Sequence, residues 1–161
     1  MAYSHFGNPK KCQPEIVHVA TFKKYALPIS DLKTIYNCYI KPVLVYATPV
    51  WNGGITREQA ARLESIQKRA LRVILGREYY SYEAALSRLQ LPLLSDYRES
   101  ICIDFAKKLS APESRFGHLF PSRDPTVRTT RHSRKVPQMK YRTNRLRDSA
   151  IPYFIRLIND Q

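Results

Sequence analysis

Basic side chains on one predicted helix are the residues of this chain with the clearest chemistry. Five basic residues fall on the polar side of the segment 56–76, opposite its apolar residues: Arg57, Arg62, Lys68, Arg69 and Arg72. A row of exposed ammonium and guanidinium groups can neutralise successive backbone phosphates without reading bases. The competing interpretation is that this basic face only keeps the domain soluble.

The charge of the whole chain favours a polyanionic partner. Its 161 residues include 27 Lys and Arg against 13 Asp and Glu, a formal net charge of +14. Such a surplus favours nucleic acid over an acidic membrane face. No apolar run reaches the length of a membrane span, and the polar opening MAYSHFGNPKKCQPE does not have the form of a signal peptide. We therefore expect no membrane association and an intracellular location, nuclear or cytoplasmic.

The sequence offers no constellation for catalysis. Nucleotidyl transfer needs two divalent ions held by paired carboxylates, and no two acidic residues are neighbours here. The three cysteines and four histidines do not have zinc-site spacing. Gly53-Gly54 lacks the lysine and the spacing of a phosphate-binding loop. We expect no enzymatic activity, no cofactor, no metal and no small-molecule substrate.

Helical signals predict an all-α fold, a small helical bundle. Thr56 and Gln59 have the spacing of a capping box, and Gly76 stands where a left-handed C-terminal cap of the helix is expected. A short helix over 82–89 is predicted behind Ser81, and a longer one begins near Ser95 and ends before Pro112.

The first helix is predicted to start with Ser30 as its N-cap and to end around Trp51, where Pro49 stops it. Pro42 should make it kink or restart near Lys41. A period of 3.6 residues gives its apolar stripe, and the tyrosines of the stripe are then core residues rather than base-stacking platforms. The stripe comprises Leu32, Ile35, Tyr36, Tyr39, Val43, Tyr46, Ala47 and Val50.

Three regions follow from composition. Residues 1–27 form a loosely ordered lead-in, residues 28–120 the helical domain, and residues 121–161 a basic tail that ends in a short helix. Residues 121–148 hold nine Lys or Arg against two Asp, with few apolar residues, so this part is predicted to be partly disordered.

The sequence resembles a known protein family at two stretches, YNCYIKPVLVYATPVWNGG and LESIQKRALRVIL. Further blocks of residues extend the match along the chain. The chain resembles the thumb and following C-terminal region of reverse transcriptases of non-LTR (LINE-type, jockey-like) retrotransposons over roughly residues 25–159. Gln90 and Tyr97 depart from the pattern, which has glycine and a basic residue there. The further blocks contain Leu89, Leu91, Pro92, Leu94 and Arg98, and then Arg142, Thr143, Asn144, Arg145, Ser149, Pro152 and Tyr153.

The resemblance implies a thumb-like module that lies along a primer–template duplex behind an active site. The catalytic aspartates of that family precede this region, so the resemblance implies a truncated fragment without the catalytic palm. Its partner would be the backbone of an RNA–DNA hybrid or duplex, bound without sequence preference. The predicted nucleic-acid-binding residues are Arg57, Lys68, Arg69, Arg72, Arg98, Arg142 and Arg145.

Two other functions stay open. The chain could be a protein-interaction module whose first and fourth helices dock on a separate polymerase core, or that associates with itself, with the basic tail incidental. It could also be a decayed retroelement remnant without function. For the tail, a polybasic linker competes with a second phosphate contact by Arg142 and Arg145.

Overall fold

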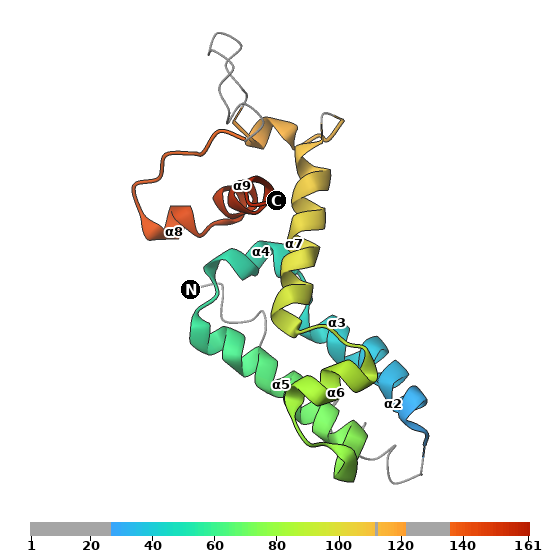
Figure 1. Cartoon of the computed structure of the whole chain (residues 1–161). Coiled ribbons are helices and arrows are strands. Elements are labelled where there is room, and N and C mark those ends of the chain that lie inside the picture. The colour runs from blue at the N-terminus through green and yellow to red at the C-terminus, as the bar shows by residue number, and fades with distance from the viewer. Residues whose placement is uncertain (1–26, 112, 122–135) are drawn as a thin grey trace. The chain divides into compact units, whose positions relative to one another are not determined.

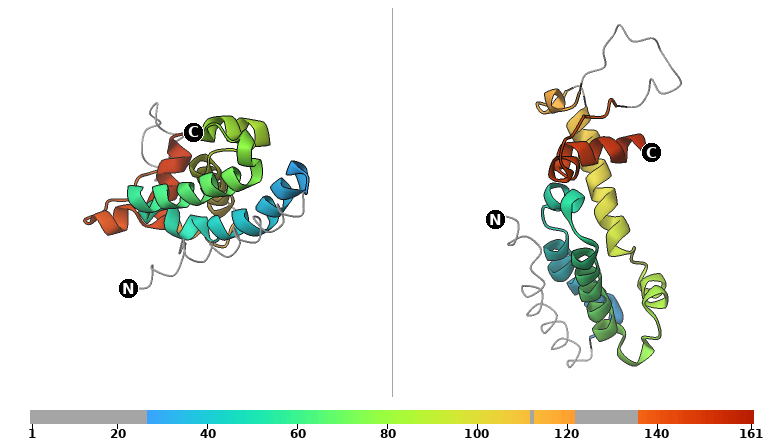
Figure 2. Two further views of the ribbon diagram at one scale, coloured as in Figure 1. Left: turned by 90° about the horizontal axis from the view of Figure 1, so that it is seen from below. Right: turned by 90° about the vertical axis from the view of Figure 1, so that its left-hand side faces the viewer.

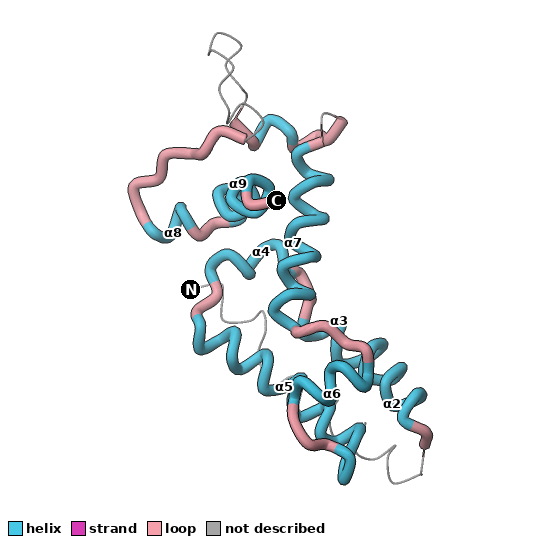
Figure 3. Tube along the Cα trace, viewed as in Figure 1, coloured by secondary structure: helices cyan, strands magenta, loops and turns pink. Residues whose placement is uncertain are grey.

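The described part of the chain is all-α. The computed structural model describes residues 27–111, 113–121 and 136–161, and these residues form helices and loops without any strand (Figure 3). The predicted all-α class is confirmed. The predicted lead-in, up to residue 26, and the basic stretch 122–135 lie outside the described residues.

The chain divides into two compact units. Unit 1 contains the described residues 27–47 and 55–97, and unit 2 contains residues 48–54 together with those described from 98 onward. This division differs from the predicted regions 28–120 and 121–161, because residues 48–54 pack with the C-terminal residues.

Unit 1 is built around one long amphipathic helix, α5 (Arg57–Leu75). It packs against α2 (Ile29–Ile35) and α6 (Tyr82–Leu89), as Figures 1 and 2 show. The other elements are the π-helix η2 (Tyr36–Ile40), α3 (Lys41–Leu44), the 3-10 turn η4 (Gly76–Glu78) and the first turn of α7 (Leu94–Ser110). Ser81 caps α6 as predicted, because its Oγ accepts the Ala84 amide at 3.1 Å.

A π-helical turn carries the chain past Pro42. The amide of Lys41 donates to the Tyr36 carbonyl, five residues back, and α3 restarts at Lys41 as predicted. Proline has no amide to donate to the carbonyl four residues before it, and the wider turn accommodates this missing bond.

The same turn changes which residues are buried. The buried positions repeat every four residues, so the predicted stripe is wrong in its second half. Tyr39 and Tyr46 are 66% and 67% exposed, and Val43 is also exposed. A wider turn needs more than 3.6 residues to return to the same face, which moves the buried row away from these side chains. The buried row is Leu32, Tyr36, Ile40, Leu44 and Thr48.

The start and end of this segment also differ from prediction. Pro28, not Ser30, is the N-cap of α2, and the Ser30 hydroxyl donates to Asp31 Oδ1 instead. The helix breaks before Pro49, at a turn in which Ala47 has a φ of 50°. Pro49 then lies in the first turn of α4 (Thr48–Trp51), where a missing amide costs nothing.

Unit 2 is assembled from segments far apart in the sequence. It contains α4, the 3-10 turn η3 (Asn52–Gly54), the rest of α7, η5 (Gly117–Leu119), α8 (Asn144–Arg147) and α9 (Ala150–Asn159). The predicted C-terminal helix is therefore present as α9. Its apolar side packs on α7 around a core of Cys102, Ala106, Phe120, Phe154, Ile155 and Leu157.

Candidate nucleic-acid interface

The helix that presents the predicted basic face is fixed at both ends by local signals. Thr56 Oγ1 accepts the Gln59 amide at 3.2 Å, and Gln59 Oε1 accepts the Thr56 amide at 2.9 Å, so the capping box is complete. Gly76 ends the helix with a φ of 59° and a ψ of −117°, so the end falls at the predicted residue but not in the predicted left-handed conformation. Glycine adopts these angles without steric cost. Nineteen residues at 1.5 Å each make α5 about 28 Å long.

The exposed side of α5 carries the predicted cations. Arg57, Lys68, Arg69 and Arg72 are all exposed, whereas Leu63, Ile66, Gln67, Ala70, Leu71, Ile74 and Leu75 are buried. From residue 65 to residue 75 the sequence has no acid. The four predicted residues of unit 1 thus share one exposed helix side.

The two acids of α5 are engaged elsewhere. Glu58 forms an ion pair with Arg62 at 2.5 Å, one turn along the helix. Glu64 accepts a hydrogen bond from the Tyr82 hydroxyl and another from the Leu94 amide at 3.3 Å. The positive side of α5 beyond residue 64 is therefore not interrupted by its own acids.

Aromatic rings support two of these cations. Lys68 Nζ lies 4.9 Å from the centre of the Tyr82 ring, and the Arg72 guanidinium carbon lies 5.1 Å from that of Tyr79. Contacts of this kind contribute about 0.5–1 kcal/mol at exposed sites, enough to bias a side chain without fixing it. Burial raises the pKa of Tyr82, and its hydrogen bond to Glu64 adds to the shift, so the phenol stays neutral beside Lys68.

Arg98 does not lie on this surface. It is only 3% exposed, and its Nη1 donates to Asn52 Oδ1 at 2.8 Å. Its guanidinium carbon also lies 5.7 Å from the centre of the Trp51 ring. The predicted phosphate contact at Arg98 is wrong, because this guanidinium is used inside unit 2.

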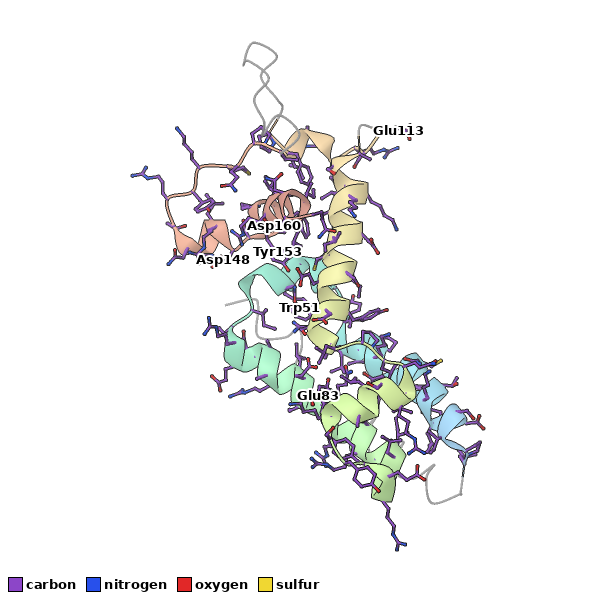
Figure 4. All side chains as sticks on the ribbon, in the orientation of Figure 1. Trp51, Glu83, Glu113, Asp148, Tyr153 and Asp160 are labelled. Carbon is purple, nitrogen blue, oxygen red and sulfur yellow. The ribbon has the colours of Figure 1, made fainter. Side chains whose placement is uncertain are left out.

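Arg98 belongs to a polar cluster between α4, η3, α7 and α9. Asn52 Nδ2 donates to the Tyr153 hydroxyl at 2.8 Å, which links η3 to α9. The Cys102 thiol lies beside these groups and is fully buried; burial raises its pKa to about 11, and Arg98 partly opposes the shift. Burial likewise raises the pKa of the Tyr153 hydroxyl. Figure 4 labels Trp51 and Tyr153 among the side chains of this unit.

Arg142 and Arg145 are exposed in unit 2, not in the unit that contains α5. Arg145 lies on the four-residue helix α8, whose N-cap Thr143 accepts the Leu146 amide on its Oγ1 at 3.3 Å. The two predicted tail contacts are therefore neighbours of one another at an ordered helix start.

Other basic residues of this region are tied to a single acid. Arg147 Nε donates to Asp148 Oδ1 at 2.8 Å, and Arg156 Nη2 lies 3.7 Å from the same oxygen. The Arg147 guanidinium lowers the pKa of Asp148. The segment that leads to α8 is anchored where Asn159 exchanges two hydrogen bonds with the backbone of Val136.

Sequence reasoning missed a second set of cations in unit 1. Lys33 and Lys41 border a shallow groove with Asn37 between them, and Lys41 Nζ lies 3.6 Å from the centre of the Tyr97 ring. In the sequence, Lys33, Asn37 and Lys41 are spaced four residues apart. This spacing indicates a row of side chains on one helix face only once the π-helical turn is known, because this turn helps to align them.

The described residues contain neither a cluster of metal ligands nor a membrane-spanning helix. Within them, no three His, Cys, Asp or Glu side chains gather as metal ligands. No helix in the described ranges is both long and apolar enough to cross a membrane.

Comparisons with protein-family models, curated proteins and solved structures find no match for this chain. The resemblance to the thumb region of non-LTR reverse transcriptases stays a prediction.

Proposed function

We propose that the chain binds the sugar–phosphate backbone of a nucleic-acid duplex through the exposed basic side of α5, without reading bases. The observation that carries this proposal is the exposure of Lys68, Arg69 and Arg72 on a helix whose acids, Glu58 and Glu64, are engaged elsewhere. Arg57 begins the same helix and would extend the contact.

The spacing of these cations suits a repeating anionic partner. Lys68 and Arg72 are one helical turn apart, about 6 Å along the axis at 1.5 Å per residue. Arg69 lies between them in sequence and broadens the charged strip. Neutralising phosphates releases condensed counterions, so each contact with duplex DNA contributes about −0.9 to the slope of log K against log salt. Three contacts would contribute a slope of about −2.7.

The resemblance supports a specific role for such a contact. A thumb-like module would bind a primer–template duplex and hold it in register, while a separate palm domain would carry out catalysis. Arg142 and Arg145 of unit 2 would be a second, weaker contact with a phosphate backbone. In this proposal the chain itself is not an enzyme.

Charge reversal on α5 tests the proposal. The variant Lys68→Glu, Arg69→Glu, Arg72→Glu should weaken binding to a labelled RNA–DNA hybrid at least tenfold. It should also make the slope of log K against log salt less steep, by roughly the contribution of three phosphate contacts. Fluorescence anisotropy at several salt concentrations measures both quantities, and circular dichroism checks that the helix content is retained.

A matched control separates local contact from net charge. Reversing three exposed cations outside α5, Lys107, Lys108 and Arg115, changes the formal charge by the same six units, from +14 to +8. This control should bind within a few-fold of the natural chain. Equal losses in both variants, or no loss in the α5 variant, would reject the assignment of the site.

One observation favours a second candidate, a protein-interaction module that docks on a separate polymerase core. Tyr39, Val43 and Tyr46 are exposed on the α2–α3 segment of unit 1, where the sequence predicted a buried stripe. Contiguous exposed apolar side chains mark interaction surfaces more often than scattered ones do. If the α5 reversal leaves binding unchanged while the variant Tyr39→Ser, Tyr46→Ser abolishes concentration-dependent self-association, this second candidate is the better one.

A further inference from the structure

Unit 1 contains a shallow groove that no part of the proposed duplex contact uses. Its volume is about 530 Å³, within the range of sites for small organic ligands. One wall is the α2–α3 segment, and the other is the connection from α6 to α7. None of the α5 cations lines it.

The helical wall is polar along its length. Lys33, Asn37 and Lys41 follow one another at intervals of four residues, beside the buried row that begins at Leu32. The π-helical turn η2 contains Asn37 and lies between the two lysines. At 1.5 Å per residue the two lysines are about 12 Å apart along the axis, with the Asn37 amide midway. Their flexible stems allow both ammonium groups to converge on one group bound above Asn37.

The opposite wall adds an amide and an apolar shelf. Gln90 adopts a left-handed conformation, φ 51° and ψ 48°, where α6 ends and the chain turns back. Leu91 and Pro92 follow it, and the Pro92 carbonyl is held by Gln67 Nε2 at 3.1 Å. Pro42 lines the groove from the helical wall. The groove thus combines two cations and two amides with the apolar side chains of Leu91 and Pro92.

Charge decides the class of ligand. No acid is among the residues that line the groove, so the two ammonium groups favour a di-anion such as a phosphomonoester. Lys41 already lies 3.6 Å above the Tyr97 ring, which holds its ammonium at the groove. An isolated phosphate would leave the apolar shelf uncovered, whereas a nucleotide offers a flat base to it.

We propose that this groove binds the phosphomonoester of a nucleotide, with Lys33 and Lys41 neutralising the phosphate, Asn37 and Gln90 donating hydrogen bonds, and the base packing on Leu91 and Pro92. The phosphate can belong to a free mononucleotide or to the 5′ end of a strand. This site is separate from the basic side of α5, so it does not depend on the duplex contact proposed for that helix.

Titration of the isotopically labelled chain with adenosine 5′-monophosphate, followed by NMR, tests the site. Amide resonances of Asn37, Lys41 and Gln90 should shift with the nucleotide, and adenosine at the same concentration should shift them far less. Lys33→Gln combined with Lys41→Gln should raise the dissociation constant at least tenfold, while Lys33→Arg combined with Lys41→Arg should keep it within a few-fold.

Three further arms complete the experiment. The variant reversed at Lys68, Arg69 and Arg72 should bind the mononucleotide normally, so failure of the duplex proposal and failure of this one are distinguishable. If a strand with a 5′ phosphate binds better than the same strand with a 5′ hydroxyl, the site is assigned to a strand end. If the two strands bind equally and the mononucleotide binds, the site is assigned to the free nucleotide. Equal shifts with adenosine and its monophosphate, or unchanged binding by the glutamine variant, would overturn the proposal.

Discussion

Replacing Gly53 with alanine should disrupt the packing of unit 2 through a single methyl group. A Cβ at this position would lie 2.8 Å from the Asp148 carbonyl oxygen, 2.8 Å from Tyr153 Cγ and 2.9 Å from Tyr153 Cβ. Two of these atoms are a backbone oxygen and a Cβ, which cannot move without moving the connection between α8 and α9 or the start of α9. Figure 4 labels Asp148 and Tyr153 at these two places.

The size of the effect follows from these distances. Overpacking of this kind costs about 1–3 kcal/mol, because the neighbouring backbone must shift. The shift would also strain the hydrogen bond from Asn52 Nδ2 to the Tyr153 hydroxyl, which is 2.8 Å long. We expect the free energy of unfolding of unit 2 to fall by about 2 kcal/mol in Gly53→Ala.

The neighbouring glycine provides a matched control. A Cβ at Gly54 would lie 3.7 Å from the Asp148 oxygen, an ordinary contact. Its φ is not positive, so Gly54→Ala should be neutral or stabilising by about 0.4–1 kcal/mol. The same chemical change is therefore expected to destabilise the protein at residue 53 and not at residue 54.

Urea unfolding followed by tryptophan fluorescence measures this difference. Trp51 is the only tryptophan of the chain and belongs to unit 2, so its emission reports on that unit. Similar unfolding midpoints for Gly53→Ala and Gly54→Ala would show that α9 does not lie against η3 as described, and the reasoning about the Arg98 cluster would fail with it.

Three further predictions concern single residues. Gln90 is left-handed at φ 51°, a conformation that costs a non-glycine residue about 1–2 kcal/mol, so Gln90→Gly should stabilise the chain by about 1 kcal/mol in urea unfolding while Gln90→Ala should not. In a Cys12→Ser background, a thiol reagent at pH 8 should modify exposed Cys38 quickly and buried Cys102 only after unfolding; fast reaction of both would contradict the burial. Because burial raises the pKa of Cys102 from 9.0 to about 11, its neutral thiol contributes stability that is present below pH 9 and is lost as the pH rises toward 11.

Signals carried by adjacent residues predicted structure well. The capping box at Thr56 and Gln59 fixed the start of α5, and Ser81 fixed the start of α6, because each depends on hydrogen bonds within one turn. The exposure of Lys68 was predictable for a similar reason: a regular helix places its polar side opposite its apolar one.

The α2–α4 segment shows where such reasoning stops. A period of 3.6 residues placed Tyr39 in the core, but the π-helical turn before Pro42 rotates it into solvent. Gln90 gives a different example. Its backbone is left-handed, a conformation that glycine adopts without steric cost.

By itself, the sequence determined the all-α class, the bounds of the capped helices and the positive side of α5, because these depend on contacts within a few residues. Only the tertiary structure decided the role of Arg98, since the side chains that surround it come from η3, α4 and α9, far away in the sequence. The same holds for the groove beside Lys33 and Lys41, whose second wall comes from the end of α6. Burial and convergence depend on which distant segments meet, and no local pattern encodes that meeting.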